Sequence, residues 1–213
     1  SMQALEQVAI ANADEQRMVG HYWLRQPQLA PDDETREHIA HEINLIETFS
    51  RNVANGVIKA PNGKKFSDVL WIGIGGSALG PLLMVRALEN QGEGLSFHFF
   101  DNVDPDGMSR VLGGLGEALT TTLVITVSKS GATPEPHLGM QQARLRLEEM
   151  GGQWARQAVA VTMLNSRLDK QAQDESWLER FDMFDWVRGR TSITSAVGLL
   201  PGALIGSDIR EFL

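Results

Sequence analysis

The sequence VLWIGIGGSALGP, from Val69 to Pro81, joins an apolar run of strand length to a helical pattern through a turn of small residues. A second stretch, VITVSKSGATPEP from Val124 to Pro136, has the same design. Each predicts a buried strand, a tight turn and the start of a helix. Two such turns in one chain of 213 residues raise the question of whether they belong to one binding site.

Short apolar runs alternate with helical segments from residue 68 onward, without tight hairpin signals between them. This alternation is typical of a parallel sheet that is covered by helices on both faces. We therefore expect a doubly wound, Rossmann- or flavodoxin-like α/β fold. The expected strands are residues 68–74, 95–100, 121–127, 158–163 and 183–187, and the expected helices between them are residues 78–90, 105–119, 134–150 and 168–181.

The two ends of the chain differ from this central pattern. Acids after Pro31 and isoleucines at helical spacing before Gly56 predict a long helix, so residues 1–60 are expected to form an N-terminal helical arm and residues 61–213 the α/β domain. Residues 196–205 are apolar nearly all round, which predicts cover on several sides. We expect that cover from a partner subunit or from a missing part of a longer protein, and hence self-association of the chain.

Composition excludes several classes of function. The net charge is −8 and no stretch concentrates Lys and Arg, which argues against a nucleic-acid surface. No apolar run reaches the ~20 residues of a membrane span. The chain has no cysteine, which excludes disulfides and thiolate metal sites and suits a reducing compartment. The histidines lack metal-ligand spacing, and the start lacks a signal peptide, so we expect a cytoplasmic protein without a metal.

The first turn has the features of an anion site. Gly75 and Gly76 allow the backbone to turn sharply and approach a ligand, while Ser77 offers a hydroxyl at the helix start. The simpler interpretation is that Ser77 only caps the helix. The same letters also fit a dinucleotide fingerprint, Gly73-x-Gly75-x-x-Ala78, with Asp101 as the ribose-binding acid. The first turn alone therefore leaves an NAD site open.

The second turn supplies what a phosphate group needs. Ser128, Ser130 and Thr133 are hydroxyl donors, Lys129 is a cation, and Gly131 lets the backbone bend around an oxyanion. A polar loop before a capped helix is the alternative interpretation. Two anion-binding turns on one sheet suit a ligand with one phosphate and a row of hydroxyls. That ligand is a sugar phosphate, which favours this class over NAD.

Five stretches carry a family resemblance, in the same order along the chain. They are NADEQRMVGHYWLR from Asn12, IGIGGSALGP from Ile72, FFDNVDPDG from Phe99, VSKSGATPE from Val127 and FDWVRGRTSITSAVGLLP from Phe184. With them the chain resembles the N-terminal sugar-isomerase (SIS) domain of bacterial members of the glucose-6-phosphate isomerase (phosphoglucose isomerase) family. The resemblance covers essentially the whole chain.

The resemblance implies an SIS fold, interconversion of glucose 6-phosphate and fructose 6-phosphate, no metal or nucleotide cofactor, and a homodimer of the full-length protein. It implies that Arg190 faces the enediolate-like intermediate, where a guanidinium stabilises the oxyanion. It also implies that Gly76 and Ser77 contact the sugar end. The phosphate loop maps onto Ser128, Lys129, Ser130, Gly131, Ala132 and Thr133.

The chain also departs from the family pattern. Arg188 stands where the family has glycine, which we expect to crowd the backbone beside Arg190, and Ala132 and Pro136 each replace a frequent hydroxyl residue. The family enzyme is more than twice as long, so its glutamate base, ring-opening histidine and C-terminal lysine would lie beyond Leu213. We expect this chain to bind sugar phosphate weakly without turnover. The alternative is a non-catalytic SIS domain that senses a sugar phosphate.

Overall fold

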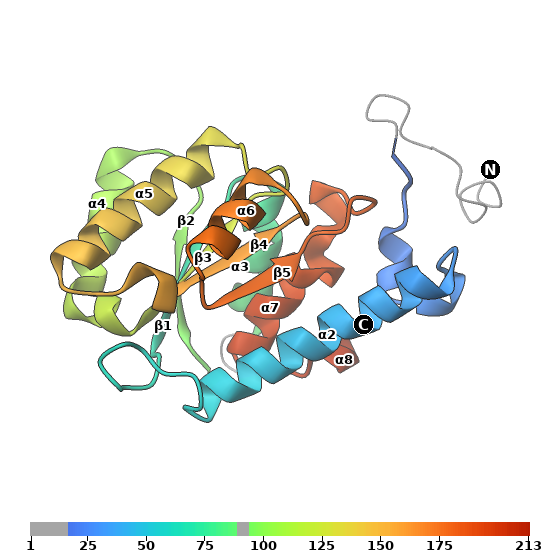
Figure 1. Cartoon of the computed structure of the whole chain (residues 1–213), viewed down its shortest axis with the longest axis horizontal. Helices are drawn as coiled ribbons and strands as arrows, with labels where there is room; N and C mark the ends of the chain where they lie inside the picture. Colours follow the sequence, from blue (N-terminus) through green and yellow to red (C-terminus); the bar gives the residue numbers. More distant parts are fainter. Residues whose placement is uncertain (1–16, 89–93) are drawn as a thin grey trace.

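A computed structural model describes residues 17–88 and 94–213 of the chain (Figure 1). Five parallel strands form one sheet with the order β2-β1-β3-β4-β5. Helices cover both faces of the sheet, so the expected doubly wound α/β fold is confirmed. The strands are β1 (Asp68–Ile72), β2 (Ser96–Phe100), β3 (Thr122–Val127), β4 (Ala158–Thr162) and β5 (Glu179–Asp182).

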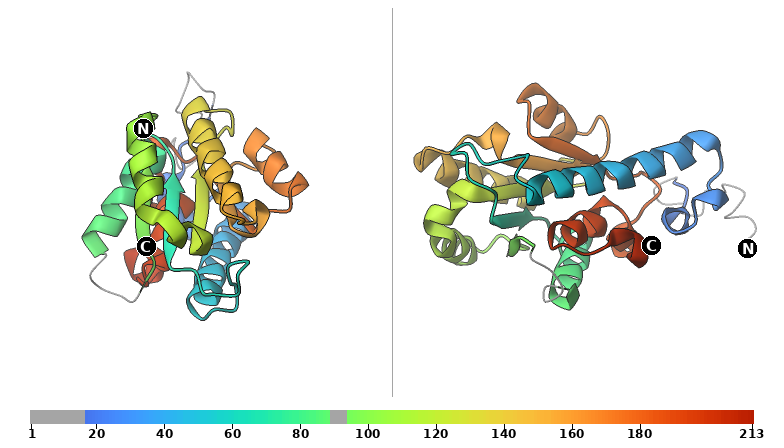
Figure 2. Two further views of the ribbon diagram at one scale, coloured as in Figure 1. Left: turned by 90° about the vertical axis from the view of Figure 1, so that its left-hand side faces the viewer. Right: turned by 90° about the horizontal axis from the view of Figure 1, so that it is seen from below.

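The helices form one layer on each face of the sheet (Figures 1 and 2). The first layer contains α2 (Asp33–Ala54), α3 (Gly76–Leu88) and α7 (Ala196–Leu204), and the second contains α4 (Pro105–Leu115), α5 (Pro134–Glu149) and α6 (Arg167–Asp174). The short helix α8 (Ile209–Phe212) follows α7. Five 3₁₀ turns complete the elements: η1 (His21–Leu24), η2 (Pro27–Leu29), η3 (Gly116–Thr121), η4 (Trp154–Arg156) and η5 (Gly189–Thr194).

Alternate strand residues point to opposite helix layers. Val69 and Trp71 of β1 belong to the core under α2 and α7, whereas Leu70 and Ile72 belong to the core under α4, α5 and α6. This follows from the two-residue period of a strand. Because both faces are covered, the central strands are mostly apolar, and every residue of β3 is buried.

The apolar segment near the chain end is covered from within the chain, which corrects the expectation from sequence. Eight of the nine residues of α7 are buried. The helix lies between α2 and α3, and Gly202 of α7 lies next to Met84 of α3. The packing of α7 therefore needs neither a partner subunit nor a further segment, and it gives no reason to expect self-association.

The last strand is the other error of the sequence-based prediction. The pattern predicts it at residues 183–187, but β5 is Glu179–Asp182, and the helix expected at 168–181 ends at Asp174. The apolar residues after β5 are buried by ring packing instead of strand pairing: Phe184 stacks on Trp186 with 4.7 Å between ring centroids, and Trp186 lies 5.0 Å from Trp23. The edge strand β5 itself begins with charged residues, so its composition does not indicate a strand.

The other elements follow the prediction closely. The four remaining strands differ from it by at most two residues at an end. Helix α3 begins two residues earlier than expected, and residues 89 and 90 of its expected range lie outside the described residues. The expected helix 105–119 divides into α4 and η3, because the chain adopts a positive φ of 48° at Gly116.

The N-terminal part packs on the sheet. Trp23 of η1 and Ile39 and Phe49 of α2 share one core with β1 and β3. The aspartate that precedes α2, Asp32, accepts a hydrogen bond from the backbone N–H of Thr35 at 2.7 Å and so caps the helix. A domain boundary at residue 60 stays a prediction, and residues 1–16 of the expected arm lie outside the described residues. In the described part of the chain, no helix has the length and hydropathy of a membrane span.

Candidate functional site

The two turns singled out in the sequence meet at the carboxyl edge of the sheet. From β1 the chain passes through α3 to β2, and from β3 it passes through α5 to β4, so the connections leave these neighbouring strands in opposite directions. Open α/β sheets bind ligands at such a switch point because the loops separate there and leave a crevice. The turn after β1 and the turn after β3 form the two sides of this crevice.

A cavity of about 330 Å³ occupies the crevice. This volume lies in the range of small-molecule sites. Six of the nine residues predicted for the site line it, namely Gly76, Ser77, Ser128, Lys129, Ser130 and Thr133. Gly131 and Ala132 lie in the same loop between these, and Arg190 follows Gly189, which also lines the cavity.

The inner part of the loop after β3 is fixed to the neighbouring strand. The backbone N–H of Ser128 donates to Val161 O at 3.1 Å, and the Thr162 hydroxyl donates to Ser128 O at 2.6 Å. The outer part then turns back at Gly131, whose N–H donates to Ser128 O at 3.1 Å. Gly131 has a φ of +67°, and a Cβ there would lie 2.3 Å from the backbone nitrogen of Leu168. Glycine is therefore required at this position.

Hydroxyl groups are the main donors that the loop offers. The Ser128 hydroxyl donates to Thr133 Oγ1 at 3.2 Å, which leaves the proton of the Thr133 hydroxyl for another acceptor. Thr133 stands at the N-cap position of α5 but makes no capping hydrogen bond with its side chain. Pro134 and Pro136 carry no N–H, so Glu135 has the one backbone N–H among the first three helix positions. An anion here would depend on the hydroxyls more than on helix amides.

The glycine turn of β1 touches the opposite loop backbone to backbone. Gly75 has a φ of +56°, which makes the turn tight. A Cβ on Gly76 would lie 2.4 Å from the carbonyl oxygen of Gly189, so only hydrogen fits between the two chain segments. Ser192 closes this corner, because its hydroxyl lies 2.8 Å from Gly189 O and 3.4 Å from Gly76 O. The start of α3 and the start of η5 are therefore one packed unit.

Lys129 extends its amine away from the serine-rich loop. Its Nζ donates to Asp185 O at 2.6 Å and to Val187 O at 2.7 Å. Both carbonyls belong to the segment between β5 and η5. The sequence suggested Lys129 as a cation for phosphate, whereas these contacts tie two loops of the site together.

The arginines of that segment are arranged as follows. Arg190 is exposed in the first turn of η5, next to the cavity residue Gly189. Arg188 precedes η5 with φ −93° and ψ 157°, an ordinary extended conformation. The backbone at position 188 is therefore unstrained, while the crowding beside Arg190 that the family pattern suggests stays a prediction.

Arg17 lines the cavity, although no role for it follows from the sequence. Its Nε lies 2.9 Å from Asp185 Oδ1. Arg17 belongs to one of the five family-like stretches, so the sequence does single out its neighbourhood. Only the folded chain, however, brings Arg17 beside a segment near the other end of the sequence.

The charged groups of the cavity are unbalanced. Among the described residues that line the cavity there are two cations and no carboxylate or imidazole, in a chain of net charge −8. This balance favours an anion and leaves the cavity without a side-chain base.

No group of three or more His, Cys, Asp or Glu side chains in the described ranges is arranged to hold a metal ion. Asp101, the acid of the dinucleotide interpretation, is exposed and accepts a hydrogen bond from Asn102 Nδ2 at 2.7 Å. It lines a different hollow, beside α4.

The fold and the site define an open parallel α/β domain with a cavity between a glycine turn and a hydroxyl-rich loop. Comparison with known proteins then gives the family. The sequence model of phosphoglucose isomerase matches residues 2–213, and the chain belongs to this family.

Several relatives are close in sequence. The chain is 82% identical over 213 residues to glucose-6-phosphate isomerase of Prochlorococcus marinus (strain MIT 9313), which covers 100% of this chain and 39% of that protein. It is 74% identical over 213 residues to the enzyme of Synechococcus sp. (strain CC9605), covering 100% of this chain and 40% of that protein. The chain thus spans about two fifths of the length of the curated relatives it matches.

Solved structures agree with the fold. A glucose-6-phosphate isomerase from Chlamydia trachomatis D/UW-3/Cx superposes with a TM-score of 0.81 at 30% identity, covering 99% of this chain and 40% of that chain. A hypothetical protein from Thermus thermophilus superposes with a TM-score of 0.73 at 29% identity, covering 98% of this chain and 44% of that chain.

Proposed function

We propose that this chain is the sugar-phosphate-binding part of a glucose-6-phosphate isomerase. The observation that carries the proposal is the cavity at the β1/β3 switch point, where the glycine turn and the hydroxyl-rich loop face each other. The loop of Ser128–Thr133 would bind the phosphate, and Gly76 and Ser77 would meet the sugar. The names of the close relatives support the same reaction class.

Arg190 would act on the reacting end of the sugar. Isomerisation between an aldose and a ketose passes through an enediolate, and a guanidinium near its oxygen lowers the energy of that anion. The reaction also needs a base for the proton at C2 and an acid to open the ring. Since the described cavity residues include neither a carboxylate nor an imidazole, these groups would come from the remaining three fifths of the full-length enzyme.

The expected chemistry is therefore binding without turnover in the chain as it stands. A cytoplasmic location and a homodimeric full-length enzyme remain predictions from the sequence. The alternative of a non-catalytic sugar-phosphate sensor shares the same cavity. It would differ in lacking the catalytic continuation that the longer relatives have.

We expect glucose 6-phosphate and inorganic phosphate to raise the melting temperature of the chain, and NAD⁺ to leave it unchanged. A ligand at 100 times its Kd stabilises the fold by about 2.7 kcal/mol, which shifts the melting temperature by several degrees. Removing a hydroxyl that binds a charged ligand costs about 1.5–3 kcal/mol. Ser128→Ala and Thr133→Ala should therefore each weaken both phosphate ligands by about 10- to 100-fold.

The matched control is Ser109→Ala, which removes an exposed hydroxyl on α4. It should titrate like the wild type. Stabilisation by NAD⁺ alone, or equal ligand affinity of all three variants, would exclude the proposed site. A coupled assay on the purified chain, free of host enzyme, is expected to show no isomerase turnover.

A further inference from the structure

Lys129 occupies a position from which it can hold a neighbouring loop. Its own backbone is part of the rigid edge of the sheet, because Lys129 O accepts a hydrogen bond from the N–H of Met163 at 3.2 Å. From this fixed point the side chain reaches the carbonyls of Asp185 and Val187, at 2.6 Å and 2.7 Å. An ammonium group with two oxygens this close makes short, charge-assisted hydrogen bonds.

The segment that Lys129 contacts needs such an anchor. Residues 183–188 join β5 to η5 without regular secondary structure, yet Trp186 and Val187 are buried. The carbonyls of an irregular segment receive no donors from a helix or sheet ladder, and that of Val187 is partly buried, so it needs a donor from elsewhere. The segment leads directly into Gly189 and Arg190, and Gly189 is the residue whose carbonyl abuts Gly76.

Two of the site's parts are thus connected through one side chain. The phosphate loop contributes the lysine, and the segment that carries Arg190 contributes the acceptors. Arg17 adds a further contact to the same segment through its ion pair with Asp185 at 2.9 Å. The separation between the phosphate loop and Arg190 depends on these contacts and on the Gly76–Gly189 approach.

We propose that Lys129 is a positioning residue, whose ammonium fastens residues 185–187 to the phosphate loop and so sets Gly189 and Arg190 at the sugar end of the cavity. The inference rests on the proposed function, because it assigns Lys129 to the placement of the sugar end instead of to the phosphate alone. It distinguishes Lys129 from Ser128, Ser130 and Thr133, which offer their hydroxyls to the phosphate itself.

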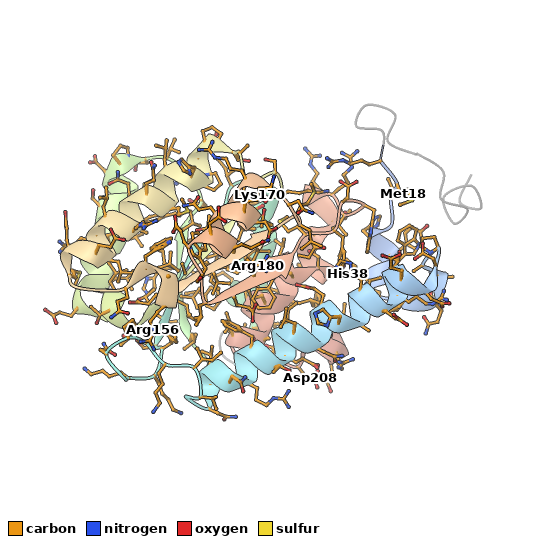
Figure 3. All side chains as sticks on the ribbon, viewed as in Figure 1. Met18, His38, Arg156, Lys170, Arg180 and Asp208 are labelled. Atoms are coloured by element: carbon orange, nitrogen blue, oxygen red, sulfur yellow. The ribbon has the colours of Figure 1, made fainter. Side chains whose placement is uncertain are left out.

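The test compares Lys129→Met, which keeps an unbranched side chain only one atom shorter and without donors, with Lys170→Met, a change of an exposed lysine on α6 (Figure 3). Hydrogen exchange without ligand is the first measurement. The N–H groups of Val187 and Thr191 bond to Phe184 O and Arg188 O and so report on the segment. In Lys129→Met they should exchange at least tenfold faster, while amides of β3 keep the wild-type rate.

Ligand affinity is the second measurement. A positioning role predicts that Lys129→Met raises the Kd for glucose 6-phosphate about tenfold and the Kd for inorganic phosphate less than threefold. Equal losses for the two ligands, with unchanged exchange at residues 187 and 191, would show a direct phosphate ligand and overturn the proposal. Faster exchange throughout the chain would also overturn it, since that indicates a general loss of stability. Lys170→Met should match the wild type in both measurements.

Two further results separate a failure of the proposed role of Lys129 from a failure of the proposed function or of folding. If the wild type binds neither ligand, the proposed function fails, but the exchange measurement still decides the role of Lys129 because it needs no ligand. If Lys129→Met does not fold, Lys129→Gln replaces it, a shorter polar side chain that should give the same local increase in exchange. Wild-type exchange in that variant would contradict the proposal.

Discussion

A Gly76→Ala variant is expected to lose about 3 kcal/mol of unfolding free energy, because the new methyl group would meet a backbone that cannot move aside. The Cβ would lie 2.4 Å from Gly189 O and 2.6 Å from Gly189 Cα. Overpacking costs about 1–3 kcal/mol, and the upper end applies where the obstacle is main chain held by other contacts. For a chain of this size the loss lowers the melting temperature by about 6 to 12 °C.

Gly80→Ala provides the control, one helical turn further along α3. A Cβ there would meet Ile193 at 3.7 Å, an ordinary van der Waals distance. Replacing a glycine by alanine inside a helix stabilises it by up to about 1 kcal/mol. The two variants therefore add the same methyl group to the same helix, and thermal or urea unfolding should move in opposite directions.

The Gly76→Ala variant should also lose affinity for glucose 6-phosphate by more than tenfold, since relief of the clash moves η5 and with it Arg190. Inorganic phosphate, bound at the loop after β3, should lose less. If Gly76→Ala were as stable as Gly80→Ala, the close approach of the two loops would not exist in solution. The interpretation of the site as one packed unit would then be wrong.

The sequence predicted the two walls of the site because their signals are local. An apolar run followed by glycines or hydroxyl residues and a helical pattern defines a strand, a turn and a helix start within about a dozen residues. The alternation of such units then requires a parallel sheet, and the carboxyl ends of parallel strands meet at one edge. Gly76 and Ser128 could be placed near each other by this reasoning alone.

The contacts that close the site could not be predicted in the same way. Lys129 and Val187 are 58 residues apart, and nothing in either local pattern indicates that a lysine will bind two backbone carbonyls. The approach of Gly189 to Gly76 and the ion pair between Arg17 and Asp185 are of the same kind. Each depends on the path of residues 183–188, of which the sequence suggested 183–187 to be a strand.

That misassignment has a physical cause. The run of residues 183–187 has the largely apolar composition of a strand, but its aromatic rings are buried by packing: Phe184 stacks on Trp186, and Trp186 packs against Trp23 of the N-terminal part. The true strand β5 is the last strand of the sheet and pairs with β4 alone. Its other edge has no neighbouring strand, so β5 can contain the charged residues Glu179 and Arg180. In the same way, the apolar surface of α7 indicated correctly that the helix needs cover, but not that α2 and α3 supply it.

A buried carboxyl group of α2 gives the second large expected effect. Glu42 is 5% exposed, and its Oε1 accepts the backbone N–H of Asp182 at 2.9 Å. It lines a cavity of about 410 Å³ between α2 and β5. His38 and Arg180, which Figure 3 labels, line the same cavity. Burial raises the pKa of Glu42 to about 8, and the nearby carboxylates of Asp182 and Glu179 add to the rise, while the N–H of Asp182 opposes it.

The pH dependence of stability follows from this shift. Below pH 4.5, the ordinary pKa of the group, Glu42 is protonated in both the folded and the unfolded chain and has no effect on the balance. As the pH rises above that value, the unfolded chain releases the proton while the folded chain keeps it until about pH 8. The unfolded state then binds fewer protons, so stability falls across this window and levels off above it.

Glu42→Gln should remove this loss of stability, because glutamine keeps an acceptor for the N–H of Asp182 and stays neutral at every pH. Between pH 5 and pH 9 the wild type should lose about 4 kcal/mol more than the variant in urea unfolding. Glu37→Gln, an exposed change on the same helix, should follow the wild type. Parallel stability curves for wild type and Glu42→Gln would mean that Glu42 ionises in the folded chain as it does in water, and that the carboxyl group is hydrated instead of buried.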